Sequence, residues 1–121
     1  MKKRIPALAA TAAVLFAFGA AGAEPPKKTP ELVAKGKASF ETNCATCHGD
    51  RGLGDGPAGA ALDPKPRNLA ATQLGPKAIF KVLATGKKGT AMIAFTHLPE
   101  EERWALAYFV DGLAGKPDAK K

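Results

Sequence analysis

Two cysteines and a histidine lie within five residues near the middle of the chain. Cys44 and Cys47 are separated by two residues, and His48 follows directly. This C-x-x-C-H pattern is typical of covalent haem c attachment. Each thiol adds to one vinyl group of the haem, and the adjacent imidazole offers a nitrogen to the iron. Because the chain has no other cysteine, the motif predicts one haem c bound through Cys44 and Cys47, with His48 as an iron ligand.

Two other kinds of site use a C-x-x-C pair. A zinc site needs four ligands, and the only further histidine is the distant His97. A thioredoxin-like redox pair follows a strand and opens a helix within an α/β pattern. Nothing strand-like precedes Cys44, and glycine follows His48. Both alternatives are therefore weaker than haem attachment.

The first 23 residues have the composition of a secretory signal peptide. A basic start is followed by an apolar stretch over residues 7–18 and by the small residues 21–23. We expect cleavage after Ala23, which leaves residues 24–121 as a single monohaem domain. Haem c is attached outside the cytoplasm, so the expected location is the periplasm. The alternative is an uncleaved membrane anchor, but this alanine-rich stretch is only weakly hydrophobic.

The charge of the expected mature chain is modestly positive. Three of the 18 basic residues are removed with the signal peptide. The remaining 15 basic and 11 acidic residues give a net charge of +4. This charge favours an acidic protein partner only weakly, and an ordinary soluble surface is the simpler interpretation. The lysines are scattered without interleaved aromatic residues, so the pattern argues against nucleic-acid binding. No membrane insertion of the mature chain is expected.

Three helices are predicted. Thr29 and Pro30 form a typical helix start, and this helix should run to about Cys44. Glycine and proline at 75–76 should open a second helix that closes near Gly86. The third is expected over residues 99–113, with three glutamates in its first turn.

Residues that share a face suggest how these helices pack. Gly36 is costly inside a helix, and close approach by another helix is one physical reason to place it there. Phe40 lies on the same face of the first helix, four residues further on. Trp104 and Tyr108 share a face of the third helix. We expect this aromatic face to pack against Gly36 and Phe40.

The loops carry the remaining signals. Four glycines in residues 49–56 exclude a regular element there, and the preceding strand of a phosphate-binding loop is missing. We interpret residues 49–57 as a loop around the edge of a flat cofactor. Met92 lies between the second and third helices and is the only methionine left after signal removal. Its thioether is a candidate sixth iron ligand. His97 is its rival, but we favour an exposed or otherwise satisfied role for that residue.

Residues 30–113 resemble a small class I c-type cytochrome of the bacterial periplasm. The resemblance rests on the first helix, the attachment motif, the glycine-rich loop, the 89–92 segment and the aromatic third helix. It implies an all-α cytochrome c fold of three to five helices wrapped around one covalently bound haem. It also implies that Cys44 and Cys47 hold the haem, that His48 is the proximal ligand and Met92 the distal one. By position, the Pro57 carbonyl would accept the other ring N–H of His48.

The expected function is one-electron transfer between a redox protein donor and acceptor, by a monomer that is not an enzyme. Lys87 and Lys88 would steer an acidic partner toward the haem edge. One departure leaves alternatives open, because many relatives have proline where this chain has Ile93. A loosened Met92 would suit a ligand-binding or sensing haem protein. A peroxidase would need an acid/base group near an open iron face, for which His97 is the only candidate.

Overall fold

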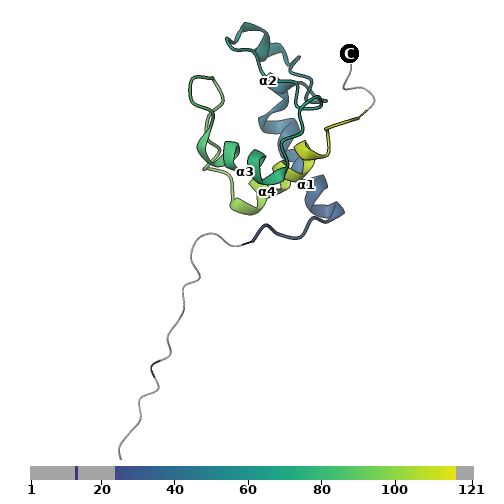
Figure 1. Cartoon of the computed structure of the whole chain (residues 1–121), viewed down its shortest axis with the longest axis vertical. Coiled ribbons are helices and arrows are strands. Elements are labelled where there is room, and N and C mark those ends of the chain that lie inside the picture. The colour runs from purple at the N-terminus through teal and green to yellow at the C-terminus, as the bar shows by residue number, and fades with distance from the viewer. Residues whose placement is uncertain (1–12, 14–23, 117–121) are drawn as a thin grey trace, which may run out of the picture.

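The described part of the chain, residue 13 and residues 24–116 of a computed structural model, contains helices and no strand (Figure 1). The α-helices are α1 (Pro30–Asn43), α2 (Ala45–His48), α3 (Pro76–Thr85) and α4 (Glu100–Asp111), and η1 (Pro57–Ala61) is a 3₁₀ helix. The expected all-α fold is therefore confirmed. The expected signal peptide lies outside the described residues except for Ala13. No helix in the described ranges is long and apolar enough to cross a membrane.

Local signals set the helix ends as the sequence predicts. The Thr29 hydroxyl caps α1 by accepting a hydrogen bond from the Leu32 N–H at 3.2 Å. Gly75 and Gly86, both with positive φ, bound α3. The last helix, α4, ends at Asp111, two residues earlier than predicted. The two short elements α2 and η1 were not among the three predicted helices, and η1 begins at Pro57, the last residue of the expected loop.

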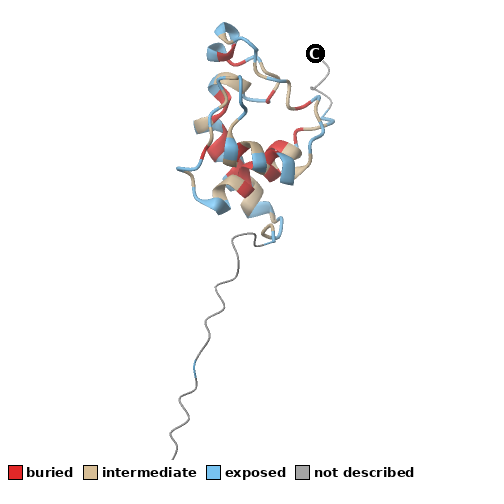
Figure 2. Ribbon diagram, turned by 60° about the vertical axis from the view of Figure 1, so that its left-hand side comes forward, coloured by how far each residue is buried: buried red, intermediate tan, exposed pale blue. Residues whose placement is uncertain are grey.

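The crossing of α1 and α4 is the central contact of the fold. A Cβ atom at Gly36 would lie only 2.0 Å from the carbonyl oxygen of Ala105, so the two helix backbones touch at this point. Phe40 is fully buried beside the contact, and its ring packs 5.2 Å from that of Phe109. Buried residues gather where these helices cross (Figure 2). The predicted close approach at Gly36 is thus confirmed.

The aromatic face of α4 meets a different helix from the one expected. Trp104 stacks on Phe80 of α3, with ring centroids 4.0 Å apart and planes inclined by 11°. The ring partner of Phe40 on α4 is instead Phe109. The expectation that Trp104 and Tyr108 would face Gly36 and Phe40 is therefore wrong. The reason is that α4 is buried on two sides, and α1 takes the side that carries the small Ala105.

Residues 24–29 have no regular structure but are tied to the body of the protein. The Tyr108 hydroxyl donates a hydrogen bond of 2.6 Å to the carbonyl oxygen of Pro26. The Lys28 ammonium lies 5.9 Å from the centre of the Tyr108 ring, within range of a cation–π contact. The structure shows a strap held across α4.

Candidate functional site: a haem c attachment motif

The attachment motif forms one turn of helix directly after α1. The Cys44 carbonyl accepts hydrogen bonds from the Cys47 N–H at 3.2 Å and the His48 N–H at 2.9 Å. Residues three apart on such a turn lie on the same side, so the two thiols share a side of the chain. Both cysteines are free thiols, with no disulfide between them. The arrangement leaves both sulfur atoms available for two thioether bonds.

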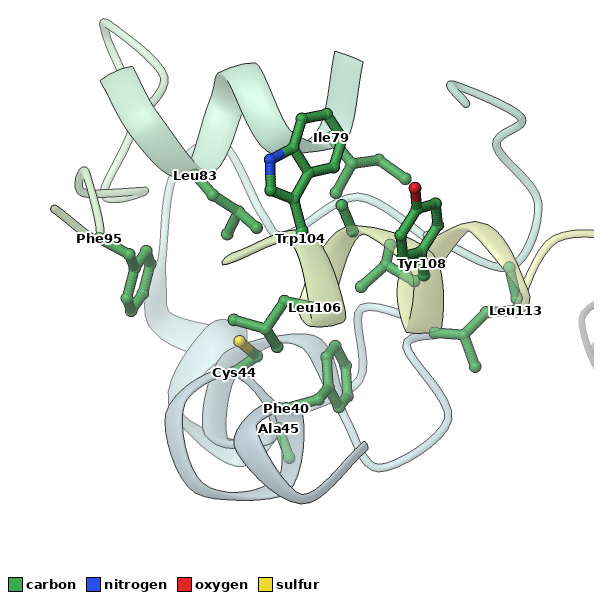
Figure 3. Packing of buried hydrophobic residues seen from close by; sticks show 13 residues of the cluster. Phe40, Cys44, Ala45, Ile79, Leu83, Phe95, Trp104, Leu106, Tyr108 and Leu113 are labelled. Carbon is green, nitrogen blue, oxygen red and sulfur yellow. The ribbon is translucent and has the colours of Figure 1, made fainter. Parts of the chain in front are cut away.

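Cys44 is a core residue. The residue is only 7% exposed, and its side chain points into the cluster of buried hydrophobic residues (Figure 3). Burial raises the pKa of the Cys44 thiol to about 11, and the neighbouring Cys47 adds to the shift. Cys47 is half-buried. An apolar group bonded to both sulfurs would therefore extend into the protein interior on the Cys44 side.

Burial favours the neutral form of the His48 ring, and one of its two nitrogen atoms has no hydrogen-bond partner among the described residues. Burial lowers its pKa from the ordinary value of 6.5. A hydrogen bond with the backbone of Arg67 acts in the opposite direction and is the smaller effect. The buried Nδ1 atom is left without a partner among the described residues. A neutral imidazole with unused nitrogen is the form that ligates iron.

The glycine-rich loop after His48 folds back on the motif. The N–H of Gly54 donates to the His48 carbonyl at 2.8 Å, and that of Gly56 donates to the Cys47 carbonyl at 3.2 Å. A Cβ atom at Gly56 would lie 2.4 Å from the Thr46 carbonyl oxygen, and one at Gly59 2.5 Å from that of Cys47. The small residues at 56 and 59 thus allow the loop to contact the backbone of the motif. Contact of this loop with the edge of a flat cofactor stays a prediction.

Pro57 opens the 3₁₀ helix η1 and is exposed. It borders an open hollow of about 220 Å³, and the hollow is not lined by Cys44, Cys47, His48 or Met92. No hydrogen bond joins the Pro57 carbonyl to His48 within residues 24–116. Its role as the acceptor for the His48 ring stays a prediction. Arg67, whose backbone does act on that ring, carries no sequence signal that would have singled it out.

Met92 lies in the loop between α3 and α4, half-buried against the same hydrophobic cluster that contains Cys44. Hydrogen bonds hold both its backbone groups. The Met92 carbonyl accepts from the Lys87 N–H at 3.0 Å, and its N–H donates to the Thr90 hydroxyl at 3.1 Å. Further along, the Phe95 N–H donates to the Leu83 carbonyl of α3 at 2.7 Å. The loop is therefore ordered by its own bonds, although Ile93 replaces proline.

His97 is exposed, as favoured from the sequence, and its ring lies 5.6 Å from that of Phe95. Across the described ranges, no three histidine, cysteine or acidic side chains gather in a way that could hold a metal ion alone. This finding weakens the zinc interpretation. The donors present are two thiols on one turn, an imidazole with an unused nitrogen, and a thioether against the same core. This set fits haem c.

Comparison with known protein families also indicates a haem c protein. Residues 31–110 match the family model described as cytochrome c oxidase, cbb3-type, subunit III. The chain belongs to this family. It is a small c-type cytochrome, and the family implies haem c as the cofactor, which fits the spacing of Cys44 and Cys47. Haem-based electron transfer is the activity associated with such a domain.

One solved structure shows the same fold in a larger chain. It belongs to the reducing HAO-like protein complex Kustc0457/Kustc0458 of Kuenenia stuttgartiensis. The match has a TM-score of 0.69 and 29% sequence identity, and it covers 75% of this chain. It covers 47% of the solved chain, so the present chain spans about half the length of that relative. A search of curated proteins finds no match.

Proposed function

We propose that this chain is a periplasmic, monohaem electron-transfer cytochrome and not an enzyme. Cys44 and Cys47 would hold the haem through thioether bonds, and His48 and Met92 would be the iron ligands. When bound, the haem supplies a one-electron ferric/ferrous couple. The observation that carries the proposal is the single turn at residues 44–48, which brings two free thiols and an under-used imidazole together in a chain of this family.

The protein contributes rigidity and an apolar environment. Phe40 and Leu106 are fully buried beside the motif, and Leu83 is 4% exposed. The bonds that hold the Met92 backbone favour a fixed distal ligand. A labile ligand, which the sensing alternative requires, is therefore less well supported. The peroxidase alternative is also less well supported, because it would need His97 beside the iron and this residue is exposed.

The charge distribution supports an acidic redox partner. Residues 64–99 contain no aspartate or glutamate. They contain six basic residues, all of them exposed and none in an ion pair within residues 24–116: Lys65, Arg67, Lys77, Lys81, Lys87 and Lys88. Ile93, 60% exposed, lies in the same segment. Lys87, Lys88 and the exposed Ile93 are close in sequence to the Met92 ligand, and this combination of positive charge and an apolar side chain suits brief docking of an acidic protein.

The relative from Kuenenia stuttgartiensis was solved as part of a multi-protein complex. That setting agrees with a redox donor and acceptor for the present chain. The proposed location rests on the basic and apolar pattern of residues 1–23. Fractionation of cells that express the full chain should recover the haem-loaded protein in the periplasm, cut after Ala23. Recovery in the membrane with residues 1–23 intact would contradict the cleavage.

The first test of the ligand set is the visible spectrum of the oxidised, haem-loaded protein. A weak sulfur-to-iron charge-transfer band at the red edge is expected in the wild type and should disappear in Met92→Ala. His97→Asn is the matched control and should retain the band. If the wild type lacks the band, or if His97→Asn alone changes the spectrum, the proposed His48/Met92 pair is wrong.

The docking surface is tested by kinetics with an acidic redox protein. The rate of electron transfer should fall as ionic strength rises, because screening weakens attraction between exposed charges. Lys87→Glu should lower the rate at low salt, whereas Lys37→Glu, on α1, should have a smaller effect. A rate that ignores both salt and Lys87→Glu would remove the steering role of this surface.

A further inference from the structure

The loop that carries Met92 is held mainly by hydrogen bonds. Its tip at residues 87–89 is exposed, and a Cβ atom at Gly89 would meet nothing within 4 Å. Ala91 and Ile93, on either side of Met92, are exposed as well. Packing anchors the two ends of the loop and the side chain of Met92, which lies against the core. Gly86 touches the backbone of residues 92–94, and Phe95 is buried in the core. The backbone of Met92, between two exposed neighbours, is therefore held by hydrogen bonds formed inside the loop.

One side chain makes two of these bonds. The Thr90 hydroxyl donates to the Lys87 carbonyl at 2.7 Å and accepts from the Met92 N–H at 3.1 Å. The same Lys87 carbonyl accepts from the Thr90 N–H at 3.2 Å, and the Lys87 N–H donates to the Met92 carbonyl at 3.0 Å. The hydroxyl thus joins the start of the loop to the proposed ligand. A short hydroxyl side chain can make both bonds because its single oxygen atom donates one hydrogen bond and accepts another.

We infer that Thr90 is the positioning residue for the distal ligand: its hydroxyl fixes the backbone of Met92 in the conformation that keeps the thioether on the iron. This inference rests on the proposed function, because it assumes that Met92 is the ligand. Thr90 itself does not touch the iron. It acts through the Met92 N–H, so its loss should raise the fraction of molecules in which the thioether has left.

The test compares haem-loaded wild type, Thr90→Val, Thr90→Ser and Met92→Ala in an imidazole titration of the ferric protein. Valine keeps the shape of threonine without the hydroxyl, and serine keeps the hydroxyl. An added ligand binds only molecules with an open iron site, so its apparent affinity scales with the open fraction. The loss of the two hydroxyl bonds should tighten imidazole binding about five- to tenfold in Thr90→Val. Thr90→Ser should stay within about twofold of the wild type, by the same reasoning.

A second readout does not depend on the iron. Amide hydrogen exchange of the Met92 N–H should be faster in Thr90→Val than in wild type or Thr90→Ser, while the α4 amides exchange as before. Unchanged α4 exchange shows that the variant is folded.

The outcomes separate two failures. If Met92→Ala changes the spectrum and imidazole affinity but Thr90→Val matches the wild type in both readouts, the inference about Thr90 is overturned and the ligand set stands. If Thr90→Ser behaves like Thr90→Val, the hydroxyl is not responsible and the inference is likewise overturned. If Met92→Ala matches the wild type, the proposed ligand set falls, and the role of Thr90 falls with it.

Discussion

Replacement of Gly36 by alanine should destabilise the haem-loaded protein through a single added methyl group. The new Cβ atom would lie 2.0 Å from the Ala105 carbonyl oxygen and 2.5 Å from its carbon, where ordinary contacts begin at 3.4 Å. The helices α1 and α4 must therefore separate locally by about 1.4 Å, the difference between 3.4 and 2.0 Å. Both partners are helix backbone and cannot turn aside, so the cost should lie near the upper end of the roughly 1–3 kcal/mol typical of overpacking.

Alanine's better helix propensity offsets about 1 kcal/mol of this cost. The net loss should be about 2 kcal/mol, which corresponds to a fall in Tm of roughly 8–16 °C for a domain of this size. The assay is thermal unfolding followed by far-ultraviolet circular dichroism. Gly112→Ala is the matched control, because Gly112 is exposed, has φ −70° and lies away from α1. It should be neutral or slightly stabilising. A Gly36→Ala protein as stable as the wild type would refute the backbone contact.

Three further predictions test other parts of the fold. Tyr108→Phe removes the hydrogen bond to Pro26 and should cost about 1 kcal/mol; protease cleavage before α1 should become faster, and unchanged cleavage would contradict the strap. Ser39→Ala loses a part-buried hydrogen bond of 2.7 Å to Glu102 of α4 and should lower the free energy of unfolding by about 1 kcal/mol. Lys35→Ala breaks an exposed ion pair and should lower it by under about 0.5 kcal/mol. Chemical denaturation that finds Lys35→Ala to be the more destabilising variant would refute this ranking. Burial lowers the pKa of His48 below 6.5 in the folded protein. As the pH falls through 6.5, the unfolded chain therefore binds more protons than the folded one, and Tm should fall between pH 7 and pH 5. A Tm that rises on acidification would contradict the burial of His48.

Short-range signals in the sequence were sufficient for the main helices. The Thr29–Pro30 start and the glycines at 75 and 86 act on the residues next to them, so they can be recognised without a partner. The attachment motif is local for the same reason. Its chemistry requires both thiols and the imidazole on one turn, and the structure forms that turn as α2.

Features that depend on distant parts of the chain could not be predicted. Which side of α4 faces α1 is decided by the fit of Ala105 against Gly36, a contact between residues far apart in sequence. The bond between Tyr108 and Pro26 spans 82 residues. The brace at Thr90 is closer to Met92, but a threonine in an exposed loop has many possible partners. Only the folded loop shows which ones it binds.

The burial of Cys44 bears on the order in which the protein is assembled. In the folded chain this thiol is covered by the core, directly after α1, which crosses α4. An attachment machinery that must reach the sulfur cannot do so once these helices have paired. Thioether formation should therefore come first, on an extended chain, and the helix crossing should close over the finished bond. Pairing of α1 and α4 would then mark a chain that already carries its cofactor.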